Sequence, residues 1–148
     1  MPADLELLRR LALDEHGLAV ISTVRANGTV HSSVVNAGLI DDPVSDVPSV
    51  GFVARGDALK LRLLRTAGHA TIVFRRGWNW AGVQGAVRII GPDDPDPDFD
   101  QDKLPSLLRD VFRAATGTHD DWAEYDRVMA AERRAAVFIA ADRVTGNS

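Results

Sequence analysis

Residues 50–91 read VGFVARGDALKLRLLRTAGHATIVFRRGWNWAGVQGAVRIIG and determine the fold that we expect for this chain. The pattern predicts a short strand over residues 50–54, a helix over residues 58–64, a strand over residues 69–74 and a longer strand over residues 78–90. Asp57 is the predicted helix cap, and Thr66 to Gly68 end the helix. Arg76 and Gly77 supply the turn between the last two strands.

Basic residues gather in this stretch although the whole chain carries a formal net charge of -4. Only Asp57 opposes them between residues 55 and 76; they are Arg55, Lys60, Arg62, Arg65, Arg75 and Arg76. Lys60 falls in the first turn of the predicted helix, where unpaired N–H groups and the helix dipole favour an anion. The stretch therefore predicts a phosphate site at Lys60. The alternative, a solvated basic helix face, stays open.

Composition narrows the function classes. With 148 residues, 45% of them hydrophobic and 26% charged, the sequence predicts one domain over residues 1–148. It has no cysteine, which excludes disulfides, thiol catalysis and zinc–thiolate sites. A pI near 5.5 argues against nucleic-acid binding. No apolar run approaches the roughly 20 residues of a membrane span, and residues 1–13 lack a secretory pattern, so we expect a cytoplasmic protein.

The remaining segments complete a mainly β pattern with flanking helices. Helices are predicted over residues 4–13, 104–115 and 120–132, and strands over residues 18–24, 30–39 and 135–141. Asn27-Gly28 predicts a hairpin between the first two strands. Residues 92–102, rich in proline and aspartate, predict an exposed acidic connector rather than a calcium loop, and residues 144–148 a tail. Six strands, several joined by hairpins, predict an antiparallel barrel with helices packed outside it, an α+β fold.

Two groups of side chains are candidates for a binding site. The strand over residues 30–39 carries polar groups that line a pocket or face solvent: His31, Ser32, Ser33 and Asn36. Trp78 and Trp80 are predicted to share one face of a strand. Aromatic rings beside a cationic site suit a planar cofactor with a phosphate tail, whereas core or subunit-interface aromatics are the plain alternative.

Several kinds of catalytic site are not supported by the sequence. The four histidines, at positions 16, 31, 69 and 119, show no metal-binding spacing, so we expect no metal site. The motifs GxGxxG, GxxxxGK[ST] and GxSxG are absent. His31 and Ser33 share a strand face, but no acid is in place to orient the histidine for nucleophilic catalysis.

Five blocks of the sequence are informative when taken together: LAVISTVRANGTVHSSVV, DALKLRLL, HATIVF, GWNWAGVQGAVRI and DDWAEYDRVMAAERRAAVFIAADRVTGN. They resemble the split β-barrel flavin and deazaflavin oxidoreductases, the superfamily that includes pyridoxamine 5'-phosphate oxidase. The likeness is greatest to the small actinobacterial F420-dependent reductases of the B group, and it extends over nearly the whole chain. It implies a split-barrel, FMN-binding-like fold and a homodimer whose cofactor sites lie at the subunit interface.

The resemblance also implies roles for individual residues. The cofactor ring would lie along Ser33, Val34, Val35 and Asn36, largely against backbone atoms, with His31 on the substrate side. The ribityl chain would run beside Val53, Ala54 and Arg55, the phosphate would bind Lys60, and Trp78 would lie at the pocket. An arginine that the family often has two residues before the lysine is Ala58 here, and Arg55 or Arg62 is a candidate to replace it.

The sequence thus favours an F420-dependent oxidoreductase that passes hydride from the reduced cofactor to an unsaturated organic substrate. No residue is assigned as catalytic acid. One alternative is an FMN-binding protein closer to pyridoxamine 5'-phosphate oxidase. Another, from a different class, is a binding protein that holds a cofactor or tetrapyrrole without turnover.

Overall fold

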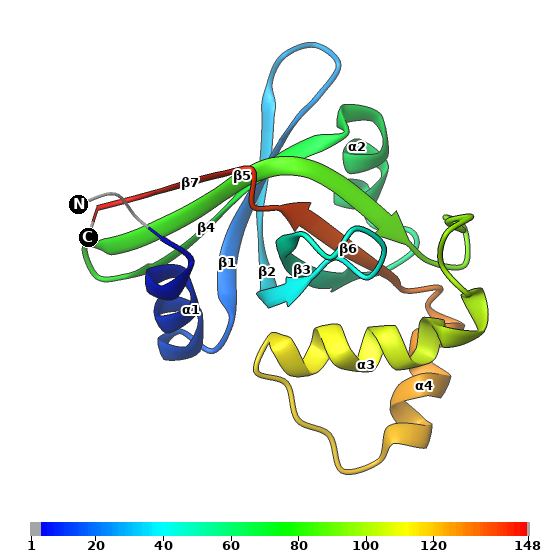
Figure 1. The fold of residues 1–148 in the computed structure, drawn as a ribbon. Helices are drawn as coiled ribbons and strands as arrows, with labels where there is room; N and C mark the ends of the chain where they lie inside the picture. The colour runs from blue at the N-terminus through cyan, green and yellow to red at the C-terminus, as the bar shows by residue number, and fades with distance from the viewer. Residues whose placement is uncertain (1–3, 148) are drawn as a thin grey trace.

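The computed structural model describes residues 4–147 and is built around a closed antiparallel barrel (Figure 1). Six strands follow one another around the barrel in the order β4-β1-β2-β3-β6-β5, and pairing of β4 with β5 closes it. Their bounds are β1 Leu18–Val24, β2 Val30–Asp41, β3 Pro48–Ala54, β4 His69–Arg76, β5 Asn79–Ile90 and β6 Ala135–Ala140. The predicted six-stranded antiparallel barrel with flanking helices is confirmed.

The β1–β2 hairpin forms at the predicted Asn27-Gly28 turn. Gly28 has φ +88°, a conformation open to glycine, and the side chain of Asn27 accepts a hydrogen bond from the N–H of Thr29 at 3.0 Å. The register pairs Val24 with Val30, so inward and outward side chains alternate in step along both strands.

Strand β2 changes partner along its length. Residues 30–36 pair with β1, whereas the segment from Ala37 onward pairs with β3. Antiparallel strands bond through alternate residues, and the N–H of Ala37 donates to the carbonyl of Gly17 in this same ladder. The N–H and C=O of Ser32 and Val34 therefore point away from β1, to an edge where β2 pairs with no other strand within residues 4–147.

The last strand was not expected from the sequence. Residues 144–148, predicted as a tail, contain most of β7 (Arg143–Gly146), which pairs with β5 beyond the end of β6; Ser148 lies outside the described residues. A bulge separates β6 from β7, and there the side chain of Asp142 accepts from the N–H of Ala86 at 3.0 Å. A Cβ on Gly85 would lie 1.9 Å from the carbonyl oxygen of Ala140, so only glycine fits opposite the bulge.

Helices close the barrel and cover one of its sides. They are α1 Leu5–Asp14, α2 Leu59–Ala67, the short 3-10 helix η1 Gln101–Lys103, α3 Leu104–Ala114 and α4 Trp122–Ala131. The side chain of Asp4 caps α1 as predicted, through the N–H of Leu7. The predicted Asp57 cap of α2 is wrong, because α2 begins after Ala58 without a side-chain cap and Asp57 lies 3.5 Å from Arg55. Lys60 is still in the first turn.

The apolar residues form two clusters that position these helices. The first fills the barrel and includes Phe52, Phe74 and Leu61, the last from α2. The second joins α3 and α4 to the barrel wall through Val111 and Phe138. Because α3 is held against β2, β3 and β6 in this way, a long helix lies beside the point where β2 changes partner (Figure 1).

The acidic connector is held more tightly than the sequence suggested. Its prolines keep most of it out of regular structure, as predicted, although Gln101 and Asp102 begin η1. Three of its aspartates pair with arginines from other elements: Asp93 with Arg133, Asp94 with Arg65 and Asp96 with Arg88. It is therefore bound to the barrel rather than freely solvated. No helix within residues 4–147 is long and apolar enough to cross a bilayer.

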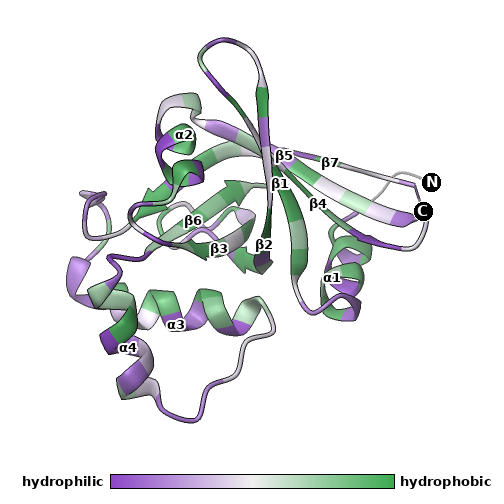
Figure 2. Ribbon diagram, turned by 180° about the vertical axis from the view of Figure 1, so that it is seen from behind, coloured by the Kyte–Doolittle hydropathy of each residue, from purple (hydrophilic) through white to green (hydrophobic). Residues whose placement is uncertain are grey.

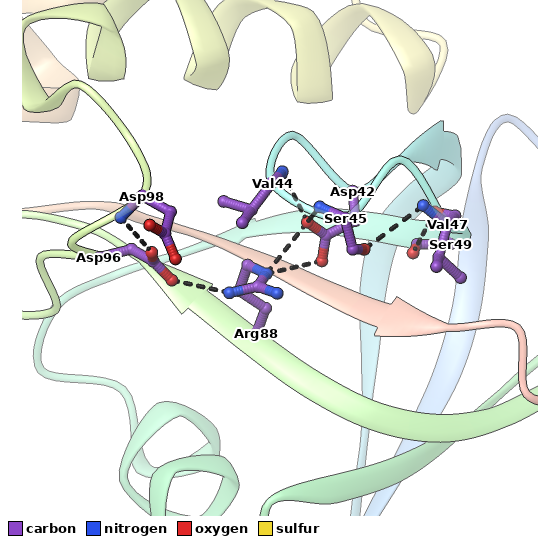
Figure 3. Close-up of polar contacts among 8 residues, drawn as sticks. All are labelled: Asp42, Val44, Ser45, Val47, Ser49, Arg88, Asp96 and Asp98. Carbon is purple, nitrogen blue, oxygen red and sulfur yellow. Dashed lines mark hydrogen bonds and ion pairs between the residues drawn. The ribbon is translucent and has the colours of Figure 1, made fainter.

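Figure 3 shows the most buried of these ion pairs. Arg88, on β5, donates to both oxygens of Asp42 at 2.7 and 3.0 Å and to Asp96 at 2.7 Å. Asp42 also accepts from the N–H groups of Val44 and Ser45, so it holds the loop over residues 42–47 in place. One arginine thus ties two loops to the barrel.

Candidate functional site

A cavity of about 430 Å³ lies where β2 and β3 separate, beneath α3 and α4. Strands and helices distant in sequence contribute its walls, because the two apolar clusters meet there. The residues that line it are Val34, Val35, Asn36, Val53, Lys60, Val111, Phe112, Ala115, Tyr125, Met129 and Arg134. Five predicted site residues are thereby brought together: Val34, Val35, Asn36, Val53 and Lys60.

Lys60 brings a positive charge to this cavity. Burial, and secondly the nearby charge of Arg134, lower the pKa of the Lys60 ammonium from its ordinary value. Within residues 4–147 Lys60 has no ion-pair partner, so its charge is not neutralised by the protein. Such an ammonium favours the binding of an anion.

Fewer of the basic residues between positions 55 and 76 are unpaired in the folded structure than the sequence suggested. Arg55, Arg65 and Arg76 each pair with a carboxylate, those of Asp57, Asp94 and Asp14, and Arg75 donates to the carbonyl oxygen of Gly77 at 2.7 Å. Two of these carboxylates lie far away in sequence, which is why counting charges along one stretch overestimated the surplus. Lys60 is the member of the predicted basic group that lines the cavity.

The β2 wall offers backbone groups. Val34 is 62% exposed and belongs to the strand edge that lacks a partner strand. The neighbouring Asn36 is engaged through its side chain, which donates to the carbonyl oxygens of His16 at 2.8 Å and Ala115 at 2.9 Å. Asn36 therefore joins β2 to the end of α3 and leaves the edge at Val34 open toward the cavity.

The helical wall is apolar and aromatic. The rings of Phe112 and Tyr125 lie 5.0 Å apart, and Met129 completes the wall from α4. The hydroxyl of Tyr125 donates to the carbonyl oxygen of Leu108 at 3.0 Å, and burial raises the pKa of Tyr125 to about 12. Tyr125 consequently stays protonated and serves as packing and a hydrogen-bond donor.

The other predicted residues lie away from this cavity. His31 is half-buried, and its Nδ1 lies 3.3 Å from a guanidinium nitrogen of Arg25. The Ser33 hydroxyl is buried without a hydrogen-bond partner among the described residues. Ala54 faces the barrel core, and Arg55 extends outward with 56% of its side chain exposed.

Trp78 differs most from its expected position. It lies in the tight β4–β5 turn rather than in the strand, and it is 92% exposed. With Trp80 it lines a separate outer hollow of about 590 Å³. Gly77, at φ +60°, makes this two-residue turn possible, so Trp78 belongs to the turn rather than to the strand, yet it still lines the same hollow as Trp80.

Six lining residues were not identified from the sequence as site residues: Val111, Phe112, Ala115, Tyr125, Met129 and Arg134. The first five follow a helical apolar pattern that is equally typical of ordinary core. Arg134 follows a helix end, where a cation is already favoured by the macrodipole. No local signal separates these roles, because the cavity forms only through tertiary contacts.

Comparison with known proteins supports the fold. No family model and no curated protein matches the sequence. Among solved structures, a pyridoxamine 5'-phosphate oxidase-related, FMN binding protein from Nostoc punctiforme is similar with a TM-score of 0.65 and 13% identity, over 95% of this chain and 79% of the other. A protein named F420 reductase is similar with a TM-score of 0.57 and 13% identity, over 86% of this chain and 88% of the other.

HupZ from Group A Streptococcus gives a TM-score of 0.61 and 16% identity, over 97% of this chain and 93% of its own. At such identities the likeness concerns architecture. Together with the closed six-stranded barrel, it establishes the split-barrel fold for this chain.

Proposed function

We propose that this split-barrel chain binds the deazaflavin cofactor F420 in the cavity between β2, α2, α3 and α4, and passes hydride from the reduced cofactor to an unsaturated organic substrate. One observation carries the proposal: an unpaired strand edge at Val34 and an unneutralised cation, Lys60, line the same cavity. The fold shared with an F420 reductase and an FMN binding protein supports a cofactor of this type.

The lining residues fit such a group. A cavity of about 430 Å³ lies within the range of small-molecule sites. The free N–H and C=O groups at Val34 suit the polar edge of a flavin-type ring, and Val53 and Phe112 supply apolar surface. Lys60 would hold the phosphate through a charge-assisted hydrogen bond.

The reduced cofactor supplies the hydride when bound, and the chain orients it and excludes water. None of the lining residues is Asp, Glu or His, and Tyr125 keeps its proton at neutral pH. No lining residue is assigned as general acid, because Lys60 holds the phosphate and the Tyr125 hydroxyl donates to Leu108, and in this proposal the proton that accompanies the hydride comes from water. Substrate selectivity would then depend on the shape of the apolar wall.

A second copy of the chain is part of the proposal. The outer face of β1 and β2 exposes Leu18, Val20, Val24, Val30 and Val34, and in Figure 2 no helix crosses in front of these strands. Burying such a face is worth about 25 cal/mol for each Å² of apolar surface. We infer a homodimer through this face, which includes Val34 and therefore continues into the cavity.

Trp78 takes its role from the dimer. On its own chain it lies at an exposed hairpin tip and does not line the cavity. A 92% exposed indole is unusual unless another molecule covers it. In this proposal the hairpin tip of one subunit lies against the cavity of its partner and shields the bound ring from water.

Equilibrium titration of the purified protein with F420 and with FMN tests the cofactor assignment. Tight F420 binding, followed by oxidation of the reduced cofactor with a panel of unsaturated compounds, is the expected result. Tight FMN binding with negligible F420 binding would replace the cofactor by FMN. Binding of either cofactor without turnover across the panel would favour a carrier protein.

A further inference from the structure

We propose that Arg134 is the second cation of the cavity and binds the same phosphate-type anion as Lys60, in competition with the carboxylate of Glu132. Because it assigns a residue to the cofactor cavity, this role rests on the proposed function. It also specifies the ligand: the group held there carries at least one phosphate, rather than being a neutral ring alone.

The β3–β6 pairing brings Arg134 to the start of α2. In this ladder Ala54 lies opposite Ala135, the residue next to Arg134. Just beyond the ladder the N–H of Gly56 donates to the carbonyl oxygen of Glu132 at 3.1 Å. A Cβ on Gly56 would lie 2.6 Å from the carbonyl oxygen of Arg133, so glycine allows the two segments to approach this closely.

The end of α4 then separates two neighbouring arginines. The N–H of Arg133 donates to Ala130 and that of Arg134 to Met129, and Arg133 has φ +49°, the left-handed conformation that ends many helices. The Arg133 side chain pairs with Asp93 of the connector, whereas Arg134 lines the cavity. The turn therefore directs the side chain of Arg133 to the connector and that of Arg134 to the cavity.

Charge is unbalanced at the cavity. Arg134 is bonded to Glu132 Oε1 through Nε at 2.9 Å and Nη2 at 2.8 Å, and Lys60 has no ion-pair partner within residues 4–147. Two cations and one carboxylate leave a net positive charge, and no acidic residue lines the cavity. Like charges kept close together in partly desolvated surroundings favour a bound anion, and the planar guanidinium matches phosphate geometry.

Neither arginine suggested by the sequence takes this position. Arg55 pairs with Asp57 at 3.5 Å and extends outward. Arg62 follows Lys60 by two residues, which on a helix turns it to a different face, and it does not line the cavity. Arg134 therefore replaces the cation that the family pattern would place at Ala58.

Inorganic phosphate is the direct probe, measured by calorimetric titration of the full chain. Arg134→Gln should weaken phosphate binding by about tenfold, the loss of one charge-assisted hydrogen bond. Arg62→Gln, on the same helix as Lys60 but away from the cavity, should leave it unchanged. Glu132→Gln releases Arg134 from its competing carboxylate and should tighten phosphate binding. This gain should disappear when Arg134→Gln is added, whereas the mere loss of a nearby negative charge would tighten binding in both backgrounds.

The cofactor assignment is tested separately, by comparing FMN or F420 with its dephosphorylated form. Arg134→Gln should weaken binding of only the phosphorylated form, and equal weakening of binding of both forms overturns the role of Arg134.

The two proposals can fail separately. Phosphate binding that depends on Arg134, with no binding of either cofactor, keeps the anion site and rejects the proposed function. Cofactor binding that is indifferent to Arg134→Gln and Glu132→Gln rejects the anion role and keeps the function. If Arg134→Gln does not fold, Arg134→Lys takes its place: it keeps the charge but loses the planar guanidinium, and it should weaken phosphate binding.

Discussion

Lys60 shows how one residue links protonation to binding. Burial and Arg134 lower its pKa, so at high pH the folded protein releases this proton before the unfolded chain does. As pH rises through the lowered pKa, the free energy of unfolding therefore increases, whereas affinity for an anion decreases because the ammonium is lost. We expect cofactor affinity to fall as pH rises toward the ordinary lysine pKa of about 10.5.

Titrations across this range check the prediction, with Lys60→Gln as control. The variant should bind more weakly at neutral pH and show a flatter pH dependence, because its side chain does not titrate. An equally steep decline in both proteins would assign the pH dependence to another group.

Asp42 provides a second residue-scale prediction, this time for stability. It is 6% exposed; burial would raise its pKa, but hydrogen bonds from Ser45, Arg88 and Val44 outweigh burial and lower it. The stabilisation of the folded state by the ionised Asp42 carboxylate is therefore fully present above the unfolded pKa of about 3.9, and it is lost as pH falls through the lower pKa of the folded protein. Asp42→Asn should reduce the free energy of unfolding by about 2 to 3 kcal/mol near pH 7.

Denaturant unfolding measures this change. Asp98→Asn is the matched control, because Asp98 lies in the same group of residues (Figure 3) but its carboxylate makes no hydrogen bond or ion pair there. The control should unfold like the wild-type protein. Equal stability of the two variants would show that the Arg88 pair contributes little.

At the scale of elements, a tightly packed glycine joins β2 to α3. A Cβ on Gly38 would lie 1.9 Å from the carbonyl oxygen of Ala114, so Gly38→Ala must push the helix outward. Overpacking of this kind costs about 1 to 3 kcal/mol. Because Ala115 lines the cavity and bonds to Asn36, cofactor affinity should fall as well.

Thermal melts and cofactor titration together test this coupling. Ser32→Ala changes an exposed position of the same strand away from α3 and should have a smaller effect on both. A Gly38→Ala protein with lower stability but unchanged affinity would show that α3 does not shape the site.

The elements that sequence alone predicted are those with strong local signals. The Asn27-Gly28 turn and the leucines of α2 determine their own conformations, and both lie where expected. The strand β7 has only four residues and depends on the free edge of β5, which no local pattern reveals. The Asp57 cap was wrong because the turn from β3 extends one residue further, so that Ala58 is the N-cap and α2 begins at Leu59.

The whole molecule determines the part of the site that the sequence missed. Residues from β2, β3 and α2 were predictable because the family likeness and the basic helix start both point to them. Arg134 was not, since its approach to Lys60 depends on the β3–β6 register and on a turn at the end of α4. Trp78 was misplaced for a similar reason, because the hairpin turn rather than the strand holds it.

The proposed dimer is tested at this scale. Val20 is 44% exposed on the outer face of β1, where a carboxylate would be buried by a partner. We expect the wild-type protein to sediment as two chains of 16.0 kDa and Val20→Asp as one. Val47→Asp, at 38% exposure in the loop before β3, should remain dimeric. A monomeric wild-type protein would contradict the interface.

The measurement that tests the central claim most directly is an equilibrium titration of wild-type protein and Lys60→Ala with F420 and FMN. If the cavity holds the phosphate-bearing cofactor, the substitution should weaken binding of whichever cofactor the wild-type protein prefers by about 1.5 to 3 kcal/mol, roughly ten- to hundredfold, with the fold intact. Unchanged affinity in Lys60→Ala would place the cofactor elsewhere and contradict the account.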